Sequence, residues 1–191
     1  MLANRVHKNV RHRRKWAKRE GVSCYRIYDR DIPEIPLAID WYEGRLHIAE
    51  FTQLDEVDAH DIHVWSQAVA DTLGVPSNHT YLKRRARQKG SAQYERIATV
   101  NDQFTVTEGG LKFWVNLVDY IDTGLFLDHR RTRAQIGEES QGCHVLNLFA
   151  YTATFSVYAA VGGAQSTTSV DLSKTYLAWA QENFVLNGLD P

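Results

Sequence analysis

Two features of this sequence have residue types and positions that suggest chemistry: an aspartate and a turn that lacks glycine. Asp171 directly follows the strand-like run TTSV at residues 167–170, and the turn at residues 149–153, with the sequence FAYTA, closes the apolar run at 144–149. If the two runs are neighbouring parallel strands, both features lie at the carboxyl edge of one sheet, where α/β folds bind ligands. The carboxylate of Asp171 is then placed to accept hydrogen bonds from the two hydroxyls of a ribose.

The composition of the turn restricts the ligand. Folds that bind dinucleotides place glycines here so that a pyrophosphate can approach the bare backbone. Residues 149–153 instead carry side chains where a diphosphate would need space. A nucleoside whose charged parts are an amino acid and a sulfonium meets no such conflict, and S-adenosylmethionine is such a ligand. From the residues alone an alternative stays open, in which Asp171 only caps the helix that follows.

The segments around these features are predicted to alternate between strand and helix. Helices are expected at residues 125–139, at 154–160 and after Ser173, which serves as an N-cap. With strands at 144–149 and 167–170, the alternation predicts a doubly wound α/β domain. The apolar composition of 144–149 also predicts a strand that is covered on both faces.

The N-terminal half has a different pattern. Residues 4–19 have apolar residues near helical spacing and a natural stop at Gly21, which predicts a basic amphipathic helix that leads into the fold without forming its core. A small α+β domain is expected over residues 21–117. Its expected elements are a strand at 24–29, a hairpin of 37–41 and 46–51, a helix at 58–73, a strand at 81–84 and a hairpin of 104–108 and 111–117.

The charges are segregated although the net charge is -1. Residues 1–20 and 83–89 together hold 13 of the 22 lysines and arginines. Such clustering suits phosphate binding, and Tyr81 and Tyr94, which flank the second cluster, could stack on bases. A solvated helix face and an exposed loop are the alternative. The candidate RNA contacts are Arg13, Arg14, Lys15, Lys83, Arg84, Arg85, Arg87 and Lys89.

Other classes of protein and site find little support in the sequence. The apolar runs are far shorter than the ~20 residues of a membrane span, and the basic start contains no secretory signal. We therefore expect a cytoplasmic protein without a membrane partner. Cys24 and Cys143 stand alone and the histidines lack zinc-site spacing, so we expect reduced thiols and no metal.

Four segments of the C-terminal part resemble a known family. They are DTGLFLDHR at residues 122–130, NLFAYT at 147–152, VDLSKTYLAWA at 170–180 and NFVLNGL at 183–189. They resemble the class I S-adenosylmethionine-dependent methyltransferases of 23S ribosomal RNA. The opening segments within residues 4–29, together with RQKG at 87–90, most resemble the guanine-N7 half of the bifunctional large-subunit methyltransferases.

The resemblance implies an α/β protein in three parts. A basic helix or linker at residues 1–20 precedes a small, RNA-facing α+β domain at 21–117, and residues 118–191 begin a Rossmann-like methyltransferase domain. S-adenosyl-L-methionine is the implied cofactor and 23S ribosomal RNA the implied partner. No catalytic residue is assigned. The resemblance places at the cofactor Phe126, Asp128, Arg130, Asn147, Phe149, Tyr151, Thr152, Asp171 and Ser173.

Plainer roles stay open for some of these residues. Phe126 and Phe149 could be core residues, and Asp128 could form an ion pair with Arg130 at the start of a helix. Two departures from the family also matter. Ala153 stands where the family has glycine, so a left-handed backbone there would cost on the order of 1 kcal/mol. The family's Asp-Pro-Pro catalytic motif has no counterpart in residues 1–191.

The missing motif leads us to expect the first part of a longer enzyme, inactive by itself. The edge of the strand at 144–149 would then be unpaired and could cause self-association. In the complete enzyme a guanine N7 would attack the sulfonium methyl directly, without a general base, after local opening of the RNA. Two other functions remain open: a non-catalytic RNA-binding module and a nucleotide-dependent oxidoreductase that binds NAD.

Overall fold

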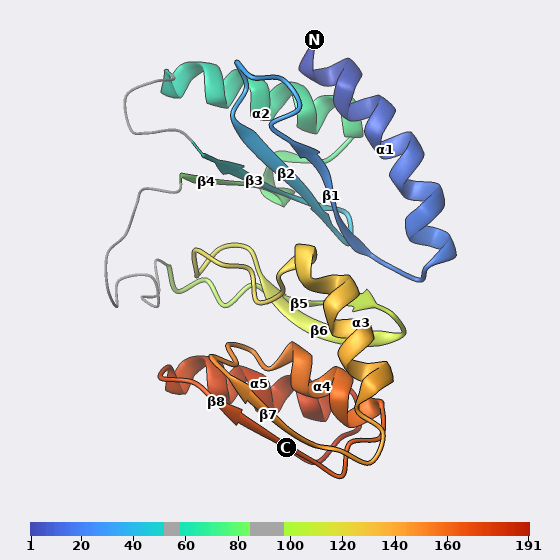
Figure 1. Ribbon diagram of the computed structural model, residues 1–191. Coiled ribbons are helices and arrows are strands. Elements are labelled where there is room, and N and C mark those ends of the chain that lie inside the picture. Colours follow the sequence, from blue (N-terminus) through green and yellow to red (C-terminus); the bar gives the residue numbers. More distant parts are fainter. Residues whose placement is uncertain (52–57, 85–97) are drawn as a thin grey trace. The chain divides into compact units, whose positions relative to one another are not determined.

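A computed structural model describes residues 1–51, 58–84 and 98–191 (Figure 1). Within these residues, no helix combines the length and the hydropathy needed to cross a membrane. The contacts divide the chain into two compact units. The first unit consists of Met1–Val100 and Leu117–Ile121, and the second consists of Asn101–Asn116 and Asp122–Pro191.

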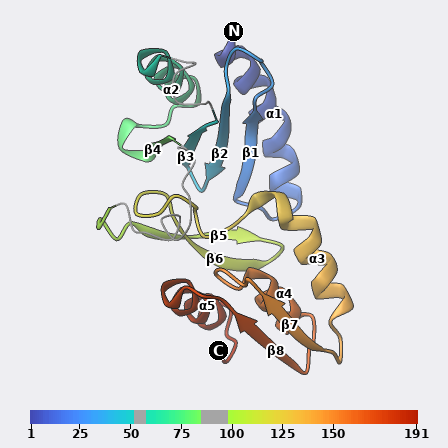
Figure 2. The same ribbon diagram turned by 60° about the vertical axis from the view of Figure 1, so that its left-hand side comes forward.

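The first unit is a four-stranded sheet with helices on one face. Its elements are α1 (Leu2–Arg19), β1 (Cys24–Asp29), β2 (Leu37–Tyr42), β3 (Arg45–Glu50), α2 (Ala59–Leu73), the 3-10 helix η1 (Ser77–His79) and β4 (Thr80–Arg84). The strand order is β1-β2-β3-β4, and the predicted strands and helix of this part are confirmed. β4 is parallel to β3 because α2 crosses between them (Figure 2).

The β2–β3 hairpin closes where the sequence predicts it. Tyr42 pairs with Arg45, which leaves Glu43 and Gly44 as a two-residue turn. Both turn residues have positive φ, 47° and 88°. Two positive φ angles are typical of the type I′ turn, whose twist matches that of the two strands.

Helix α1 is part of the core of the first unit, contrary to the prediction that residues 4–19 only lead into the fold. Its apolar stripe and that of α2 share one buried cluster with the strands, because burial of apolar surface is favourable by about 25 cal/mol per Å². The shared core includes Leu2, Val6, Val10 and Ala17 of α1, Ile62 and Val69 of α2, and Ile27, Leu37, Ile39, Leu46 and Ile48 of the strands.

The second unit joins a β-hairpin to the predicted strand-helix alternation. Its elements are β5 (Gln103–Glu108), β6 (Leu111–Asn116), the 3-10 helix η3 (Leu127–His129), α3 (Arg130–Glu139), β7 (His144–Leu148), α4 (Thr154–Val161), β8 (Ser166–Val170) and α5 (Lys174–Leu186). β7 and β8 are parallel, with His144 opposite Ser166 and Leu148 opposite Val170. The predicted parallel pair is therefore confirmed.

The prediction that residues 144–149 form a strand covered on both faces is wrong for the described residues. α4 and α5 lie on one side of β7 and β8 (Figures 1 and 2). On the other side Leu146 and Leu148 are 62% and 55% exposed, and Val170 is also exposed. An apolar run shows that both faces of a strand are suited to burial. Whether both are buried depends on which other elements pack against them.

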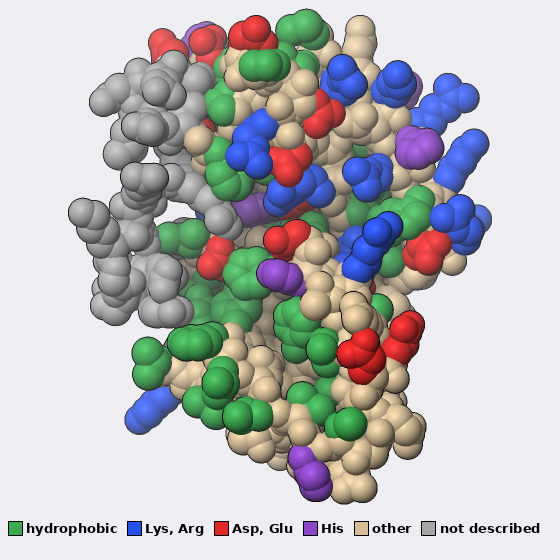
Figure 3. Space-filling view, in the orientation of Figure 1, with side chains coloured by type: hydrophobic (Ala, Val, Ile, Leu, Met, Phe, Trp, Pro, Cys, Tyr) green, Lys and Arg blue, Asp and Glu red, His purple; other side chains and the backbone are tan. Residues whose placement is uncertain are grey.

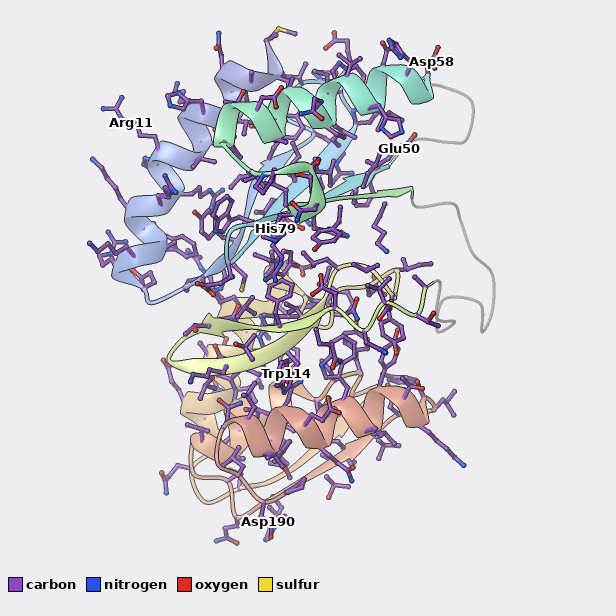
Figure 4. The ribbon with its side chains drawn as sticks, turned by 180° about the vertical axis from the view of Figure 1, so that it is seen from behind. Arg11, Glu50, Asp58, His79, Trp114 and Asp190 are labelled. Atoms are coloured by element: carbon purple, nitrogen blue, oxygen red, sulfur yellow. The ribbon has the colours of Figure 1, made fainter. Side chains whose placement is uncertain are left out.

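Two asparagines one turn apart, Asn183 in α5 and Asn187 at its C-cap, bind the β5–β6 hairpin to the rest of the second unit. The side-chain oxygen of Asn183 accepts from Trp114 N at 3.0 Å, and its amide donates to Thr152 O at 3.0 Å. The side chain of Asn187 accepts from Lys112 N at 2.9 Å and donates to Lys112 O at 2.7 Å, as a neighbouring strand would. Figure 4 labels Trp114 on β6 beside α5.

These contacts explain why the observed units differ from the predicted boundary at residue 117. The hairpin joins the second unit, whereas residues 117–121 join the first, where Val118 O accepts from Lys83 Nζ and the carboxylate of Asp119 accepts from Val100 N. Side-chain hydrogen bonds to a strand edge carry no local sequence signal. The three predicted parts, taken as separate domains, stay a prediction.

Replacing Asn183 by alanine should lower the free energy of unfolding by about 1–3 kcal/mol, because the partly buried N–H of Trp114 and the buried carbonyl of Thr152 both lose their partner. Urea unfolding measures the change. The exposed neighbour Glu182 provides the control, since Glu182→Ala should have little effect. Equal unfolding midpoints for the two variants would show that the hairpin does not depend on Asn183.

Candidate functional site

The structure brings the turn at residues 149–153 and Asp171 together at the carboxyl ends of β7 and β8. Tyr151 N donates to one carboxylate oxygen of Asp171 at 2.8 Å, and Ser173 N donates to the other at 2.8 Å. Ala150 N donates to Val170 O at 3.0 Å, which continues the strand pairing into the turn. The predicted juxtaposition of turn and acid is therefore observed, and the carboxylate is oriented by two backbone N–H groups.

The backbone of this turn is left-handed at every second residue. Phe149, Tyr151 and Ala153 have φ angles of 57°, 52° and 53°. Each such angle at a residue with a Cβ costs roughly 1–2 kcal/mol. The alternation points Phe149 outward, where its side chain is 89% exposed, and buries Ala153 completely. Ala153 therefore has the left-handed backbone that costs conformational free energy at a residue other than glycine.

A second segment, residues 122–126, is hydrogen-bonded to the same turn. Gly124 N donates to the hydroxyl of Tyr151 at 2.8 Å, and the hydroxyl of Thr152 donates to Gly124 O at 2.6 Å. Gly124 has a φ of 97°, and a Cβ there would collide with the ring of Trp179. The rings of Phe126 and Tyr151 lie 5.2 Å apart. Turn, acid and segment thus form one connected group.

A buried ion cluster of Glu108, Arg130 and Arg133 contacts this segment at the carbonyl of Phe126. Glu108, which is fully buried, accepts from Arg130 Nε at 2.7 Å and from Arg133 Nε and Nη2 at 2.8 and 2.6 Å. Arg133 Nη1 donates to Phe126 O at 2.8 Å. Burial and the charge of Glu108 raise the pKa of Tyr158, so its hydroxyl stays protonated and donates to Glu108 at 3.2 Å.

The remaining predicted cofactor residues have more varied positions. Phe126 is 42% exposed and Asp128 is exposed, whereas Arg130 is paired with Glu108. Asn147 donates to Ser156 Oγ at 3.0 Å, which places its amide against α4. Ser173 caps α5 by accepting from Tyr176 N at 3.3 Å.

Sequence reasoning missed four residues of this group. Glu108, Gly124, Arg133 and Asn183 support the turn and the segment through side chains or backbone of other elements. Gly124, Arg133 and Asn183 lie within or next to segments that the sequence singled out, so proximity was the only signal. Glu108 had none.

The predicted RNA contacts fall into four groups. Arg13, Arg14 and Lys15 are exposed on α1, where lysines and arginines gather (Figure 3). Lys83 is instead half-buried and donates to Val118 O, and burial lowers its pKa. Arg84 ends β4, and its side chain is outside the described atoms. Arg85, Arg87 and Lys89, like Tyr94, lie outside the described residues.

Ala153→Gly should raise the free energy of unfolding by about 0.5–1 kcal/mol. Glycine removes the left-handed strain of roughly 1–2 kcal/mol, and the loss of one buried methyl, about 0.8 kcal/mol, offsets part of that gain. Ala150→Gly is the matched control, since Ala150 is buried in the same turn without a positive φ and should lose stability. Denaturant unfolding that destabilises both variants alike would contradict the strain argument.

Comparison with known proteins gives a consistent result. The family model described as S-adenosylmethionine-dependent methyltransferase matches residues 25–191. The chain is 52% identical over 193 residues to ribosomal RNA large subunit methyltransferase K of Neisseria meningitidis, covering 99% of this chain and 54% of that protein. It is 53% identical over 193 residues to ribosomal RNA large subunit methyltransferase K/L of Pseudomonas fluorescens, covering 98% of this chain and 26% of that protein.

A solved structure supports the fold. The crystal structure of a putative methyltransferase complexed with SAH superposes with a TM-score of 0.76 at 30% identity, covering 99% of this chain and 48% of the other. The predicted mixed α/β, Rossmann-like fold class is therefore confirmed, and the predicted cofactor is the one on which the matched family depends. The chain spans about half, or about a quarter, of the length of the two curated relatives. With the matched family model over most of its residues, this chain belongs to the S-adenosylmethionine-dependent methyltransferases.

Proposed function

We propose that the second unit binds S-adenosylmethionine and that the first unit binds large-subunit ribosomal RNA, as parts of a ribosomal RNA methyltransferase. The contact between the turn and Asp171 carries the cofactor proposal. The names of the relatives from Neisseria and Pseudomonas support the substrate. We infer guanine N7 as the target from the resemblance of the N-terminal segments.

The residues at the edge of β7 and β8 fit a nucleoside. A carboxylate has about four acceptor positions, and the two backbone N–H groups use one on each oxygen of Asp171, so both oxygens can still accept a ribose hydroxyl. Leu172 is 92% exposed beside the acid and offers an apolar surface to a base. The side chains of the turn occupy the place where a diphosphate would lie, which disfavours NAD.

The bound cofactor supplies a methyl group on a positively charged sulfur. The chain's own residues orient and enclose it, and we assign this role to Asp171, Phe126, Asp128, Phe149 and Tyr151. Arg130, Asn147, Thr152 and Ser173 act through their neighbours, because each has a partner within the protein. Guanine N7 has an in-plane lone pair, so alignment and not proton removal would limit its methylation.

Asp171→Asn should weaken binding of S-adenosylhomocysteine by about ten- to a hundredfold, because hydrogen bonds to a charged group contribute about 1.5–3 kcal/mol. Isothermal titration calorimetry measures the affinity. The control is Asp61→Asn, on the exposed face of α2, which should bind like the original protein. Binding of NADH in place of S-adenosylhomocysteine would favour the oxidoreductase.

The RNA proposal depends on the two faces of α1. Leu2, Val6, Val10 and Ala17 pack into the core, and the opposite side is cationic. Figure 4 shows Arg11 pointing from α1 away from the sheet. Exposed lysines and arginines in this number suit a phosphate backbone. They are Arg5, Lys8, Arg11, Arg13, Arg14, Lys15, Lys18 and Arg19.

Changing Arg13, Arg14 and Lys15 together to alanine should weaken binding of a large-subunit ribosomal RNA fragment. It should also reduce the slope of log affinity against log salt by about 2, since each lost phosphate contact removes roughly 0.7–0.9. Filter binding at several salt concentrations measures both quantities, with Lys174→Ala in α5 as the control. If the slope of log affinity against log salt is unchanged in the variant, α1 does not contact the RNA.

An RNA-binding module without a cofactor is the second candidate, favoured by the cationic face of α1. It predicts RNA binding without S-adenosylhomocysteine binding.

The exposed Leu146 and Leu148 support a separate proposal, that the β7–β8 sheet associates with another chain. A cytoplasmic location stays a prediction.

A further inference from the structure

We propose that Glu108 is a positioning residue for the cofactor site, which it supports from the β5–β6 hairpin. This inference rests on the proposed function of the second unit. Glu108 is fully buried, and its carboxylate accepts from one candidate cofactor residue, Arg130. Its effect on the site would pass through the two arginines of α3.

The contacts form a continuous chain from Glu108 to Asp171. Glu108 holds Arg133, whose Nη1 donates to Phe126 O at 2.8 Å. The ring of Phe126 lies 5.2 Å from that of Tyr151, and Tyr151 N donates to Asp171 at 2.8 Å. Displacement of Arg133 would therefore release the carbonyl of Phe126 and loosen its ring beside the turn.

Stability alone is a weak reason for this cluster. A buried ion pair is often no more stabilising than apolar residues of the same volume, because both ions lose their water. What the cluster supplies is direction. The planar guanidinium of Arg133 uses Nε and Nη2 on one carboxylate oxygen and Nη1 on Phe126 O, so its orientation is fully defined.

The support of Glu108 is itself held at several points. Asn183 and Asn187 bind β6, the second strand of the hairpin. The Gly109 turn approaches the hydroxyl of Tyr158 so closely that a Cβ would lie 2.7 Å from it. The same hydroxyl donates to the backbone oxygen of Glu108 at 3.1 Å. The hairpin is thus held in place, and Glu108 can fix the position of the segment at residues 122–130 through Arg130 and Arg133.

The test compares Glu108→Gln and Arg133→Lys with the original 191 residues. Glutamine keeps the shape of Glu108 but not its charge. Lysine keeps the charge of Arg133 but lacks the planar fork that reaches Glu108 and Phe126 O together. We expect each variant to bind S-adenosylhomocysteine about tenfold more weakly by calorimetry. Amide hydrogen exchange within residues 122–130 should become faster, while exchange in the first unit stays unchanged.

Asp40→Asn is the matched control for a destabilised protein. Asp40 pairs with Arg26 at 2.8 and 3.1 Å and is nearly buried, but it belongs to the first unit. It should lower the unfolding midpoint without changing the affinity for S-adenosylhomocysteine.

Each outcome supports or overturns the positioning role of Glu108. Normal affinity in folded Glu108→Gln and Arg133→Lys would overturn the positioning role while leaving the proposed function intact. Failure of both variants to fold, judged by circular dichroism, would make the cluster a determinant of folding and also overturn the role. If the original chain itself does not bind S-adenosylhomocysteine, the proposed cofactor site fails and the positioning role fails with it.

Discussion

The candidate site depends on one carboxylate that accepts two backbone N–H groups from different elements. Asp171 binds the amide of Tyr151, in the turn after β7, and the amide of Ser173, at the start of α5. It thereby joins the ends of both parallel strands. Because these contacts use only part of its acceptor capacity, the same carboxylate can hold the turn and still accept from a ligand. Support and recognition are therefore combined in one side chain.

The turn combines a backbone conformation that usually favours glycine with residues that carry side chains. Left-handed angles at Phe149, Tyr151 and Ala153 would ordinarily favour glycine. With side chains at these positions the turn gives up close approach to its backbone and gains the hydroxyl of Tyr151, which accepts from Gly124. The strained backbone thus carries a side chain that binds the segment at residues 122–126 to the turn.

In the second unit, polar side chains connect distant elements by binding their backbone groups. Asn183 and Asn187 satisfy the edge of β6, and Arg133 satisfies the carbonyl of Phe126. In the first unit, by contrast, α1 divides its two faces between an apolar core and a cationic surface, so one helix serves both stability and charge.

Local pattern by itself determined much of this protein. Apolar runs and cap residues predicted the parallel pair β7 and β8 and the helix after Ser173, and the order of strands placed Asp171 beside the turn. Only the tertiary structure decided which face of β7 is covered, that α1 joins the core, and that the β5–β6 hairpin belongs with α5. It also decided that Glu108 and Arg133 meet. The physical reason is range: periodicity and capping act within one element, whereas the Glu108–Arg133 pair joins residues 25 positions apart and the Lys112–Asn187 bond residues 75 apart.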